Sequence, residues 1–402
     1  MPTERLHLTD SLLLRFEAKV LDHSQWNGAP SLVLDRTAFY AEGGGQLGDR
    51  GVLNWSGGTL PITDVQIDDA GVVHHLLLEP APEAITGMAV SGAIDEERRR
   101  DFMSQHTGQH MLSRALLDVA KAETISSRLG SETSTIDLSL PSIDDSLLQQ
   151  AEDLVNRAVI EDRPVAVLFP TADALAKLPL RRPPKVTTDI RILHIEGFDY
   201  SPCGGTHCAR TGQVGPVRIT KTERYKGMTR VTFLAGARTL RDYQEKDAAL
   251  RELGKALKCG PLDVMGAITR LRNELKTAQQ ELGITRTEWM KLVAERLLAE
   301  HPKHESGNTP IVAIRESADL DSLRSLAAAL CKRGDVVAFA TAKDVAAGDW
   351  MVVVERGAQA SFDCGAWLKA AAQKNGGRGG GKKEHAEGRL GISFQWSDLD
   401  IG

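Results

Sequence analysis

Two pairs of metal-binding side chains stand out in this sequence. His106 and His110 lie four positions apart in DFMSQHTGQHMLSRAL, a run of good helix formers, so a helix would present both imidazoles on one face. Cys203 and His207 have the same spacing in SPCGGTHC, where two glycines allow a sharp turn. Three imidazoles and one thiolate form a ligand set that suits zinc. Either pair by itself is commonly coincidental, but the two together predict a zinc site.

A glycine-rich stretch, DRTAFYAEGGGQLGDRG, lies between two predicted strands of the N-terminal region and covers residues 35–51. Its three consecutive glycines let the backbone approach another surface closely. Thr37, Gln46 and Asp49 flank these glycines and are polar groups that could reach a ligand. A plain tight loop is the alternative interpretation of the same residues.

The helices and strands that we expect around these residues indicate an α+β fold. Residues 1–90 consist of short β-rich or alternating runs divided by Gly, Asp and Asn turns, which predicts a small N-terminal β-barrel. Residues 91–236 combine two helices with short strands and a closing hairpin, which predicts an α+β core that contains the zinc site. The glycine-rich stretch and the two ligand pairs therefore fall in neighbouring parts of the chain.

The histidine pair lies on a segment that we expect to be helical for about 25 residues after Asp95, a good N-cap. Arg98, Arg99 and Arg100 fall in its first turns, where the helix dipole does not favour cations. These arginines therefore face either an external anion or the solvent.

Residues 237–302 have a helical pattern, and apolar side chains recur at alternating steps of three and four residues, as in the seam of a coiled coil. A break at Lys258 to Leu262 predicts two helices that fold back as a hairpin. We expect this hairpin to act as a spacer, as an oligomer interface, or as both.

Residues 303–402 predict a small C-terminal α/β domain behind a polar linker. This domain contains GGRGGGKK, residues 376–383, with the cations Lys374, Arg378, Lys382 and Lys383 in or beside it. Free backbone amides and these cations could bind the phosphates of a nucleic acid. A disordered low-complexity loop is the alternative.

The bulk composition is that of an ordinary soluble protein, with 402 residues, 42% hydrophobic and 26% charged. No apolar run approaches the ~18 residues that a membrane span needs, and no secretory segment begins the sequence. The five scattered cysteines suit a reducing compartment, so we expect a cytoplasmic protein. Because the net charge is −5, a nucleic-acid partner would have to meet local basic patches.

Four motifs in order, DRTAFYAEGGGQLGD, HTGQH, CGGTH and GGRGGGK, resemble the editing and C-terminal portions of alanyl-tRNA synthetase. Only about 35 residues precede the glycine-rich motif, and no class II synthetase motif is evident, so the aminoacylation domain is expected to be absent. The chain is therefore similar, over essentially its whole length, to the long form of the freestanding AlaX editing proteins.

The resemblance implies site residues by matching position. His106, His110, Cys203 and His207 would be the zinc ligands, and Thr37 would recognise the hydroxyl of misattached serine. Gln46 and Arg128 are the other residues that we expect to act on the substrate. The family commonly has glutamine before that basic residue, whereas this chain has Ser127.

The resemblance also implies a zinc-dependent hydrolase that acts in trans on mischarged tRNA(Ala), chiefly Ser-tRNA(Ala) and also Gly-tRNA(Ala). We expect contacts to the acceptor end and the elbow of the tRNA, and the helical hairpin or the C-terminal domain is where a homodimer would form. The predicted phosphate contacts are Arg181, Arg182, Lys185, Lys374, Arg378, Lys382 and Lys383, together with the basic stretch from Arg218 to Arg230.

The chemistry of the zinc site stays open at this level. Zinc either activates water or only positions the substrate. Four protein ligands leave no open position for water, so activation of water requires that one of them, such as Cys203, is loosely bound. Cys208 stands where the family usually has valine and could compete as a ligand. The alternative function is a tRNA-binding protein whose zinc stabilises the fold without catalysis.

Overall fold

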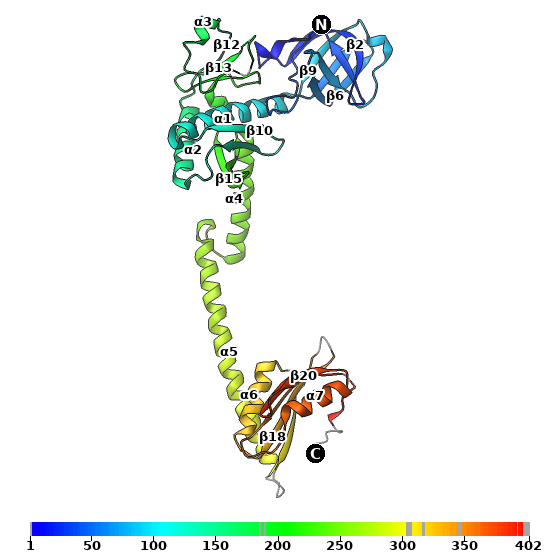
Figure 1. The fold of residues 1–402 in the computed structure, drawn as a ribbon, viewed down its shortest axis with the longest axis vertical. Helices are drawn as coiled ribbons and strands as arrows, with labels where there is room; N and C mark the ends of the chain where they lie inside the picture. Colours follow the sequence, from blue (N-terminus) through cyan, green and yellow to red (C-terminus); the bar gives the residue numbers. More distant parts are fainter. Residues whose placement is uncertain are drawn as a thin grey trace. The chain divides into compact units, whose positions relative to one another are not determined.

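The computed structural model describes residues 2–184, 186–188, 190–302, 308–315, 318–344, 348–391 and 393–396. The chain forms two compact units, residues 1–252 and 253–402, so the four predicted parts are a finer division than the observed one. The fold class is mixed α and β, as predicted, and Figure 1 shows that each unit contains both helices and β-strands. None of the described helices combines the length and apolar character that a membrane crossing needs.

The N-terminal part of the first unit is a seven-stranded sheet in the order β6-β5-β9-β2-β3-β8-β7. Strand β2 alternates exposed and buried residues, and its buried Phe16, Ala18 and Val20 point into one core. Because β6 and β7 end the strand order, pairing among the described strands does not close the predicted barrel. The strands of this sheet are β2 (Arg15–Trp26), β3 (Ala29–Leu34), β5 (Gly51–Trp55), β6 (Gly58–Ile62), β7 (Asp64–Ile67), β8 (Val73–Leu76) and β9 (Ala89–Ile94).

Short elements flank this sheet. Strands β1 and β4 pair in parallel, and a 3-10 turn follows β1 directly. These elements are β1 (Glu4–Arg5), η1 (Leu6–Leu8), β4 (Arg36–Thr37) and η2 (Glu83–Ile85).

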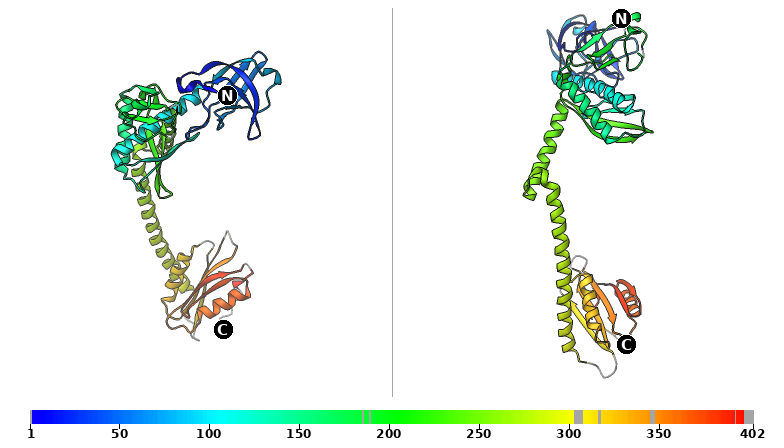
Figure 2. Two further views of the ribbon diagram at one scale, coloured as in Figure 1. Left: turned by 45° about the horizontal axis from the view of Figure 1, so that its top comes forward. Right: turned by 90° about the vertical axis from the view of Figure 1, so that its left-hand side faces the viewer.

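The rest of the first unit packs helices against two antiparallel sheets, ordered β10-β11-β16-β15 and β12-β13-β14. Helices α1 and α2 share a core with the four-stranded sheet, and Figure 2 shows them running beside it. The elements are α1 (Glu96–Ala120), β10 (Thr124–Leu129), β11 (Ser134–Leu138), α2 (Asp145–Ile160), β12 (Val165–Leu168), α3 (Ala172–Leu175), β13 (Ile192–Ile195), β14 (Asp199–Pro202), η3 (Thr211–Val214), β15 (Val217–Tyr225) and β16 (Met228–Ala235). The predicted helix after Asp95, the two short strands and the closing hairpin are therefore confirmed.

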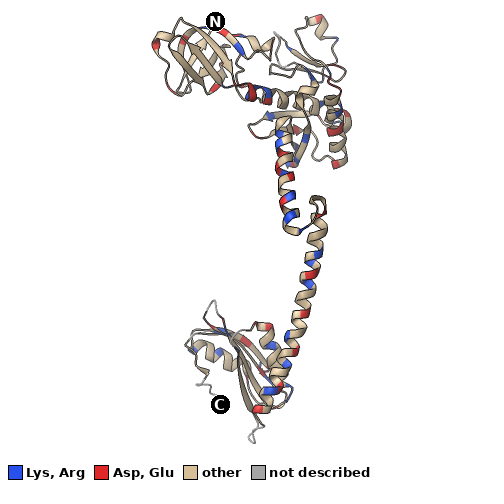
Figure 3. Ribbon diagram, turned by 180° about the vertical axis from the view of Figure 1, so that it is seen from behind, with Lys and Arg blue, Asp and Glu red and all other residues tan. Residues whose placement is uncertain are grey.

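Two helices occupy the predicted hairpin region, and a break separates them where the sequence predicts one. They are α4 (Ala237–Leu257) and α5 (Val264–Glu300), with the 3-10 turn η4 (Pro261–Asp263) between them. The predicted seam is exposed along α5, where Leu275 is 59% and Trp289 54% accessible, so the coiled coil stays a prediction. Figure 3 shows that charged residues of both signs also lie along both helices.

The second unit ends in a five-stranded sheet in the order β17-β18-β19-β21-β20. Alternate residues of β18 point to opposite faces, so Ala338 packs with α6 and Phe339 with α7. Met290 and Ala294 of α5 join the α6 side of this core. The elements are β17 (Thr309–Arg315), α6 (Leu320–Cys331), β18 (Val336–Lys343), β19 (Trp350–Arg356), α7 (Cys364–Lys374), β20 (Arg378–Gly381) and β21 (His385–Leu390).

The C-terminal glycine run differs from both interpretations of its sequence. Residues Arg378–Gly381 form the edge strand β20, which pairs with β21, so this part of the run is neither a phosphate-cradling loop nor a disordered one. A Cβ on Gly381 would lie 2.2 Å from the His385 carbonyl oxygen, so a side chain there would prevent the strands from pairing this closely. Glycine is therefore required for close strand packing at this edge.

Candidate metal centre

Four side chains from two distant segments converge in the first unit. The donor atoms of His106, His110, Cys203 and His207 all lie within 4.8 Å of one another. The Sγ atom of Cys203 is 3.3 Å from Nε2 of His106 and 3.3 Å from Nε2 of His207. Bonds of about 2.0–2.3 Å to a tetrahedral ion would place neighbouring donors about 3.3–3.8 Å apart. The prediction that the two pairs meet is therefore confirmed, and the geometry fits a single metal ion.

Helix α1 supplies the first two donors. Asp95 caps it by accepting a hydrogen bond from the Arg98 amide, and the four-residue spacing stacks the two imidazoles, whose ring centroids are 5.1 Å apart. Cys203 and His207 follow β14 on the turn that contains the two glycines. Cys203 as a whole residue is partly exposed, and the three histidines are buried.

Two of the histidines have an oxygen partner for the ring nitrogen that faces away from the cluster. Nδ1 of His106 is 2.7 Å from the Gln46 side-chain oxygen, and Nδ1 of His207 is 3.3 Å from the Thr107 hydroxyl. Nδ1 of His110 differs, because its nearest described partner is the donor Nη2 of Arg181 at 3.4 Å, and the Asp199 carboxylate oxygen is 3.9 Å away. A proton on Nδ1 leaves Nε2 free to donate its lone pair, which is the usual arrangement around metal-binding histidines. Gln46 therefore lies where it can orient His106, and its action on the substrate stays a prediction.

Burial determines the protonation of this donor set. It lowers the pKa of His106 to about 3, and the pKa values of His110 and His207 also fall well below their ordinary value. Burial raises the pKa of the Cys203 thiol. Three neutral imidazoles are ready to bind a cation, and a divalent cation would offset the cost of a buried thiolate. The chemistry of the residues therefore fits zinc.

The glycine-rich stretch brings Gln46 to the centre. The Leu129 amide donates a 2.7 Å hydrogen bond to the Gly45 carbonyl, which docks the stretch on strand β10. Gly45 has φ +89°, and a Cβ there would lie 2.4 Å from the Ser127 carbonyl oxygen. Only glycine permits this approach. The stretch is therefore a docking loop for Gln46, as well as a tight turn.

A buried ion pair anchors the same loop to α1. Arg99 is fully buried, and its guanidinium donates to the Asp49 carboxylate at 2.5 Å and to the Ala38 carbonyl at 2.6 Å. The expectation that Arg99 faces an external anion or solvent is wrong, because the chain itself supplies the anion. Arg98 is also engaged, at the Gly48 carbonyl, and Arg100 pairs with Glu96 at the surface.

Gly205 is the position where added volume would damage the centre most directly. A Cβ there would lie 2.1 Å from Cε1 and 2.4 Å from Nδ1 of His106, whereas a Cβ on Gly204 would meet nothing within 4 Å. We expect Gly205→Ala to displace His106 and to lower zinc content well below one ion per chain. Gly204→Ala should bind zinc like the unmodified protein. Metal analysis of the two purified variants checks this, and equal zinc contents would contradict it.

Thr37 and Arg128 are not joined to the cluster by any described contact. Thr37 is fully buried, and its hydroxyl is 2.8 Å from Nε2 of His75. Arg128 is exposed on β10 and pairs with Thr135, while Ser127 pairs with the buried Ile136. Paired residues share a face of the sheet, so Ser127 is on the α1 side and Arg128 points away from it. Arg128 therefore has no described contact with the metal centre, and its action on the substrate stays a prediction.

Cys208 lies outside the group of converging donors. It is buried in the hydrophobic core, and its backbone amide donates to the Thr107 hydroxyl at 3.1 Å. Burial raises the pKa of its thiol to about 11. The interpretation of Cys208 as a competing ligand is therefore wrong for this arrangement.

The predicted phosphate contacts differ in accessibility. Arg181 has a side chain only 5% exposed and pairs with Asp199, so it stabilises the surroundings of His110 instead of facing solvent. Arg182 is exposed and directly follows Arg181, whose Nη2 lies 3.4 Å from Nδ1 of His110. Lys185 lies outside the described residues. The exposed predicted contacts of the second unit are Lys374, Arg378, Lys382 and Lys383.

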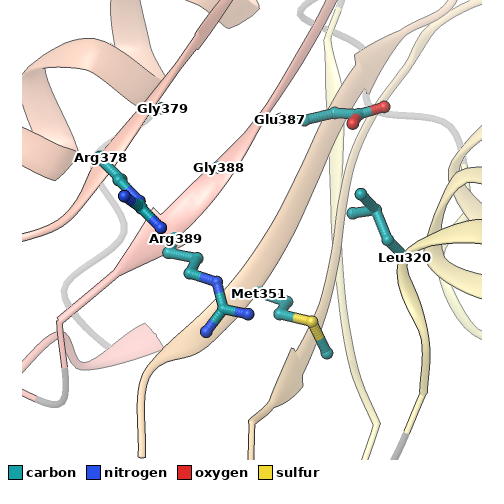
Figure 4. A pocket seen from close by; sticks show the side chains of 7 residues that line it. All are labelled: Leu320, Met351, Arg378, Gly379, Glu387, Gly388 and Arg389. Atoms are coloured by element: carbon teal, nitrogen blue, oxygen red, sulfur yellow. The ribbon is translucent and has the colours of Figure 1, made fainter. Parts of the chain in front are cut away.

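A pocket of about 520 Å³ lies on the sheet of the second unit. Arg378 and Arg389 pair across β20 and β21, and Figure 4 shows both side chains projecting into the pocket beside Met351. Glu387 lines the opposite side and is held by Arg324 through two hydrogen bonds, of 2.6 and 2.7 Å. The pocket is lined by Leu320, Met351, Arg378, Gly379, Glu387, Gly388 and Arg389. Arg378 is therefore placed where a ligand of the pocket could meet it.

Two regions of the chain match models of known families. Residues 9–98 match tRNA synthetases class II (A), although no class II motif was evident from the sequence. Residues 190–232 match the threonyl and alanyl tRNA synthetase second additional domain. The second match contains Cys203 and His207, and the first ends at the start of α1.

Curated relatives cover nearly the whole chain. The alanine–tRNA ligase of Thermococcus kodakarensis is 33% identical over 401 residues, which is 96% of this chain and 42% of that protein. The alanine–tRNA ligase of Pyrococcus furiosus is 32% identical with the same two coverages, and that of Methanopyrus kandleri is 30% identical over 397 residues. The chain spans about two fifths of the length of these relatives. It is therefore an AlaX-like relative of the alanyl-tRNA synthetases, to which it is similar over nearly its whole length.

Proposed function

We propose that the protein hydrolyses mischarged tRNA(Ala), chiefly Ser-tRNA(Ala) and also Gly-tRNA(Ala), at a zinc centre formed by His106, His110, Cys203 and His207. The observation that carries this proposal is the convergence of the two ligand pairs, because the segments that hold them lie nearly a hundred residues apart. The similarity to alanine–tRNA ligases supplies the substrate class. Clearance would act in trans, on tRNA that a separate enzyme has charged.

The selectivity has a physical reason. A synthetase pocket sized for alanine cannot firmly exclude glycine, and serine adds only one hydroxyl group. A second site that hydrogen-bonds the serine hydroxyl favours Ser-tRNA(Ala) over Ala-tRNA(Ala), which lacks that group, and this bond plays no part in clearing Gly-tRNA(Ala). Errors that binding leaves uncorrected can therefore be removed by hydrolysis at a separate centre.

The residues of the centre divide the work of ester hydrolysis. When bound, zinc would supply a Lewis acid that polarises the ester carbonyl or acidifies a water molecule. The three imidazoles and Cys203 hold the cation, and Gln46 keeps the His106 ring in the orientation that binding needs. The turn at Cys203 is partly exposed as backbone and side chain together, so the charged end of the tRNA would approach near this turn. Buried surroundings on the other sides exclude bulk water.

The decisive experiment incubates the purified protein with labelled Ser-tRNA(Ala), with and without a zinc chelator. Release of serine that chelation abolishes and added zinc restores is the expected result. Ala-tRNA(Ala) serves as the control substrate and should remain charged. Tight tRNA binding without any serine release would overturn the hydrolase proposal and favour the alternative, a tRNA-binding protein that zinc merely stabilises.

Thr37 remains our candidate for recognising the serine hydroxyl. Its own hydroxyl is buried between His75 and the Phe39 amide, so removing it also leaves buried polar groups without partners, at a cost of about 1–3 kcal/mol. We expect Thr37→Val to lose clearance of serine more than clearance of glycine, while Thr37→Ser keeps both. The measurement is kcat/KM for Ser-tRNA(Ala) and Gly-tRNA(Ala). An equal fall for the two substrates would assign Thr37 a structural role only.

Partner contacts follow from the exposed cations. Arg182 beside the metal centre would contact the acceptor end of the tRNA, and Lys374, Arg378, Lys382 and Lys383 would contact the phosphates of the elbow. A homodimer would use the exposed apolar face of α5, where Leu271, Leu282 and Leu292 are each about half accessible.

A further inference from the structure

Arg191 joins the metal turn to the N-terminal segment. Its side chain precedes β13 and is buried, with 5% of the residue exposed. Nη1 donates to the Cys203 carbonyl at 2.7 Å and to the Gly205 carbonyl at 2.9 Å. Nε donates to the Leu8 carbonyl at 2.8 Å. One guanidinium therefore bonds both ends of the cysteine–glycine turn and a residue almost two hundred positions away.

The planar fork of the guanidinium suits this task. Its donors lie in one plane at fixed angles, so the carbonyls that it binds are held at fixed positions relative to one another. With the Cys203 and Gly205 carbonyls held, the intervening peptide units cannot rotate freely. The Cys203 side chain and the approach of Gly205 to His106 are thereby fixed with respect to α1.

The N-terminal segment has two further links to the same place. The His207 amide donates to the Ser11 hydroxyl at 3.3 Å, and Arg99 donates to the Ser11 carbonyl at 2.7 Å. Residues 8–11 therefore touch the metal turn through Arg191 and His207, and helix α1 through Arg99. These contacts come from three different side chains or amides, so the segment does not depend on a single bond.

Arg191 differs from the other deeply buried arginines in its partners. Arg99 pairs with Asp49 and Arg181 with Asp199. Among the ion pairs of the described residues none involves Arg191, whose hydrogen-bond partners are backbone carbonyls. Its Nη2 is buried and has no partner among the described atoms. Burying a guanidinium without a charged partner costs free energy. This cost indicates that Arg191 has a positioning role.

We propose that Arg191 is a positioning residue of the metal centre, which holds the Cys203–Gly205 turn in its metal-binding geometry and makes assembly of the centre depend on residues 8–11. This inference rests on the proposed zinc site but not on the proposed hydrolysis. A metal-binding measurement therefore tests it separately from deacylation.

The test compares three variants by zinc affinity, measured by competition with a chromogenic chelator on protein shown to be folded. Arg191→Met should lower zinc affinity by about 10–100-fold, as loss of a group that orients a metal ligand does. Arg191→Lys should lose less, because it keeps the charge but not the fork. Arg163→Met is the matched control, since Arg163 also donates to two backbone carbonyls, those of Glu196 and Gly197, away from the metal turn.

The outcomes separate positioning from general stability. A folded Arg191→Met variant with unchanged zinc affinity, or an equal loss in Arg163→Met, would overturn the inference. If Arg191→Met does not fold, Arg191→Lys and Ser11→Ala decide, and the inference fails if both bind zinc like the unmodified protein. If Arg191→Met lowers zinc affinity but the unmodified protein does not deacylate tRNA, the proposed function is wrong and the positioning role of Arg191 is still supported.

Discussion

Replacing His207 by alanine should leave the protein without a stoichiometric metal ion and without serine release from Ser-tRNA(Ala). The variant removes one of four converging donors and leaves Thr107 without the Nδ1 partner that lies 3.3 Å from its hydroxyl. Loss of a ligand should lower zinc affinity by more than the roughly 10–100-fold that loss of a ligand's hydrogen-bond partner causes. Metal analysis and single-turnover deacylation on the same preparation measure both effects.

The same variant should lose the stabilisation that metal gives the folded state. An ion at 100 times its dissociation constant stabilises by about 2.7 kcal/mol, which corresponds to about 5–10 °C in the thermal midpoint of a domain of 150–250 residues. Chelator should therefore lower the midpoint of the unmodified protein and leave that of His207→Ala unchanged. His194→Ala is the matched control, because His194 stacks on Tyr200 at 4.1 Å outside the cluster. A chelator effect of equal size in His207→Ala would show that the ion binds elsewhere.

Arg99→Met should be the most destabilising single change outside the metal ligands. It leaves the Asp49 carboxylate buried with only the Tyr40 amide, 2.6 Å away, as a described hydrogen-bond donor. Removing one partner of a buried ion pair costs about 3–5 kcal/mol, because the remaining charge is uncompensated. The free energy of unfolding, measured in urea by linear extrapolation, should fall by about that amount.

Two comparisons test this explanation for Arg99. Arg100→Met should unfold like the unmodified protein, since Arg100 and its partner Glu96 have side chains 57% and 59% exposed. The double variant Arg99→Met with Asp49→Leu should recover part of the loss, because it removes the stranded charge. No recovery would mean that Arg99 acts through its bonds to the Ala38 and Ser11 carbonyls.

The ligand set was predictable from the sequence because its members are chemically specific and their spacing is local. Two histidines four residues apart must share a helix face wherever the helix lies, and α1 has the predicted N-cap and length. The geometry of the CGGTH turn likewise follows from its own residues. The strands of the N-terminal region were predictable for the same reason. Buried and exposed residues alternate along the first part of β2, and this alternation is visible in the sequence of the strand alone.

Contacts across long sequence separations were not predictable in this way. Gln46 has no local feature that marks it as the partner of His106, and Arg191 has none that marks Leu8, Cys203 and Gly205. Arg128 was placed at the site because it matches a family motif, but strand parity turns it to the opposite face from Ser127. Such roles depend on which atoms the packed backbone brings within hydrogen-bond distance.

The amino-acid sequence by itself determined the chemical type of the centre, three imidazoles and a thiol, and the helix that presents two of them. Tertiary structure decided what surrounds them: which group lies beside each ring, why Gly45 and Gly205 must lack a side chain, and that Arg99 faces Asp49 rather than a ligand. The physical reason is the sequence separation between the residues that interact. Helix and turn geometry follow from neighbouring residues, whereas burial and orientation arise only when distant segments pack together.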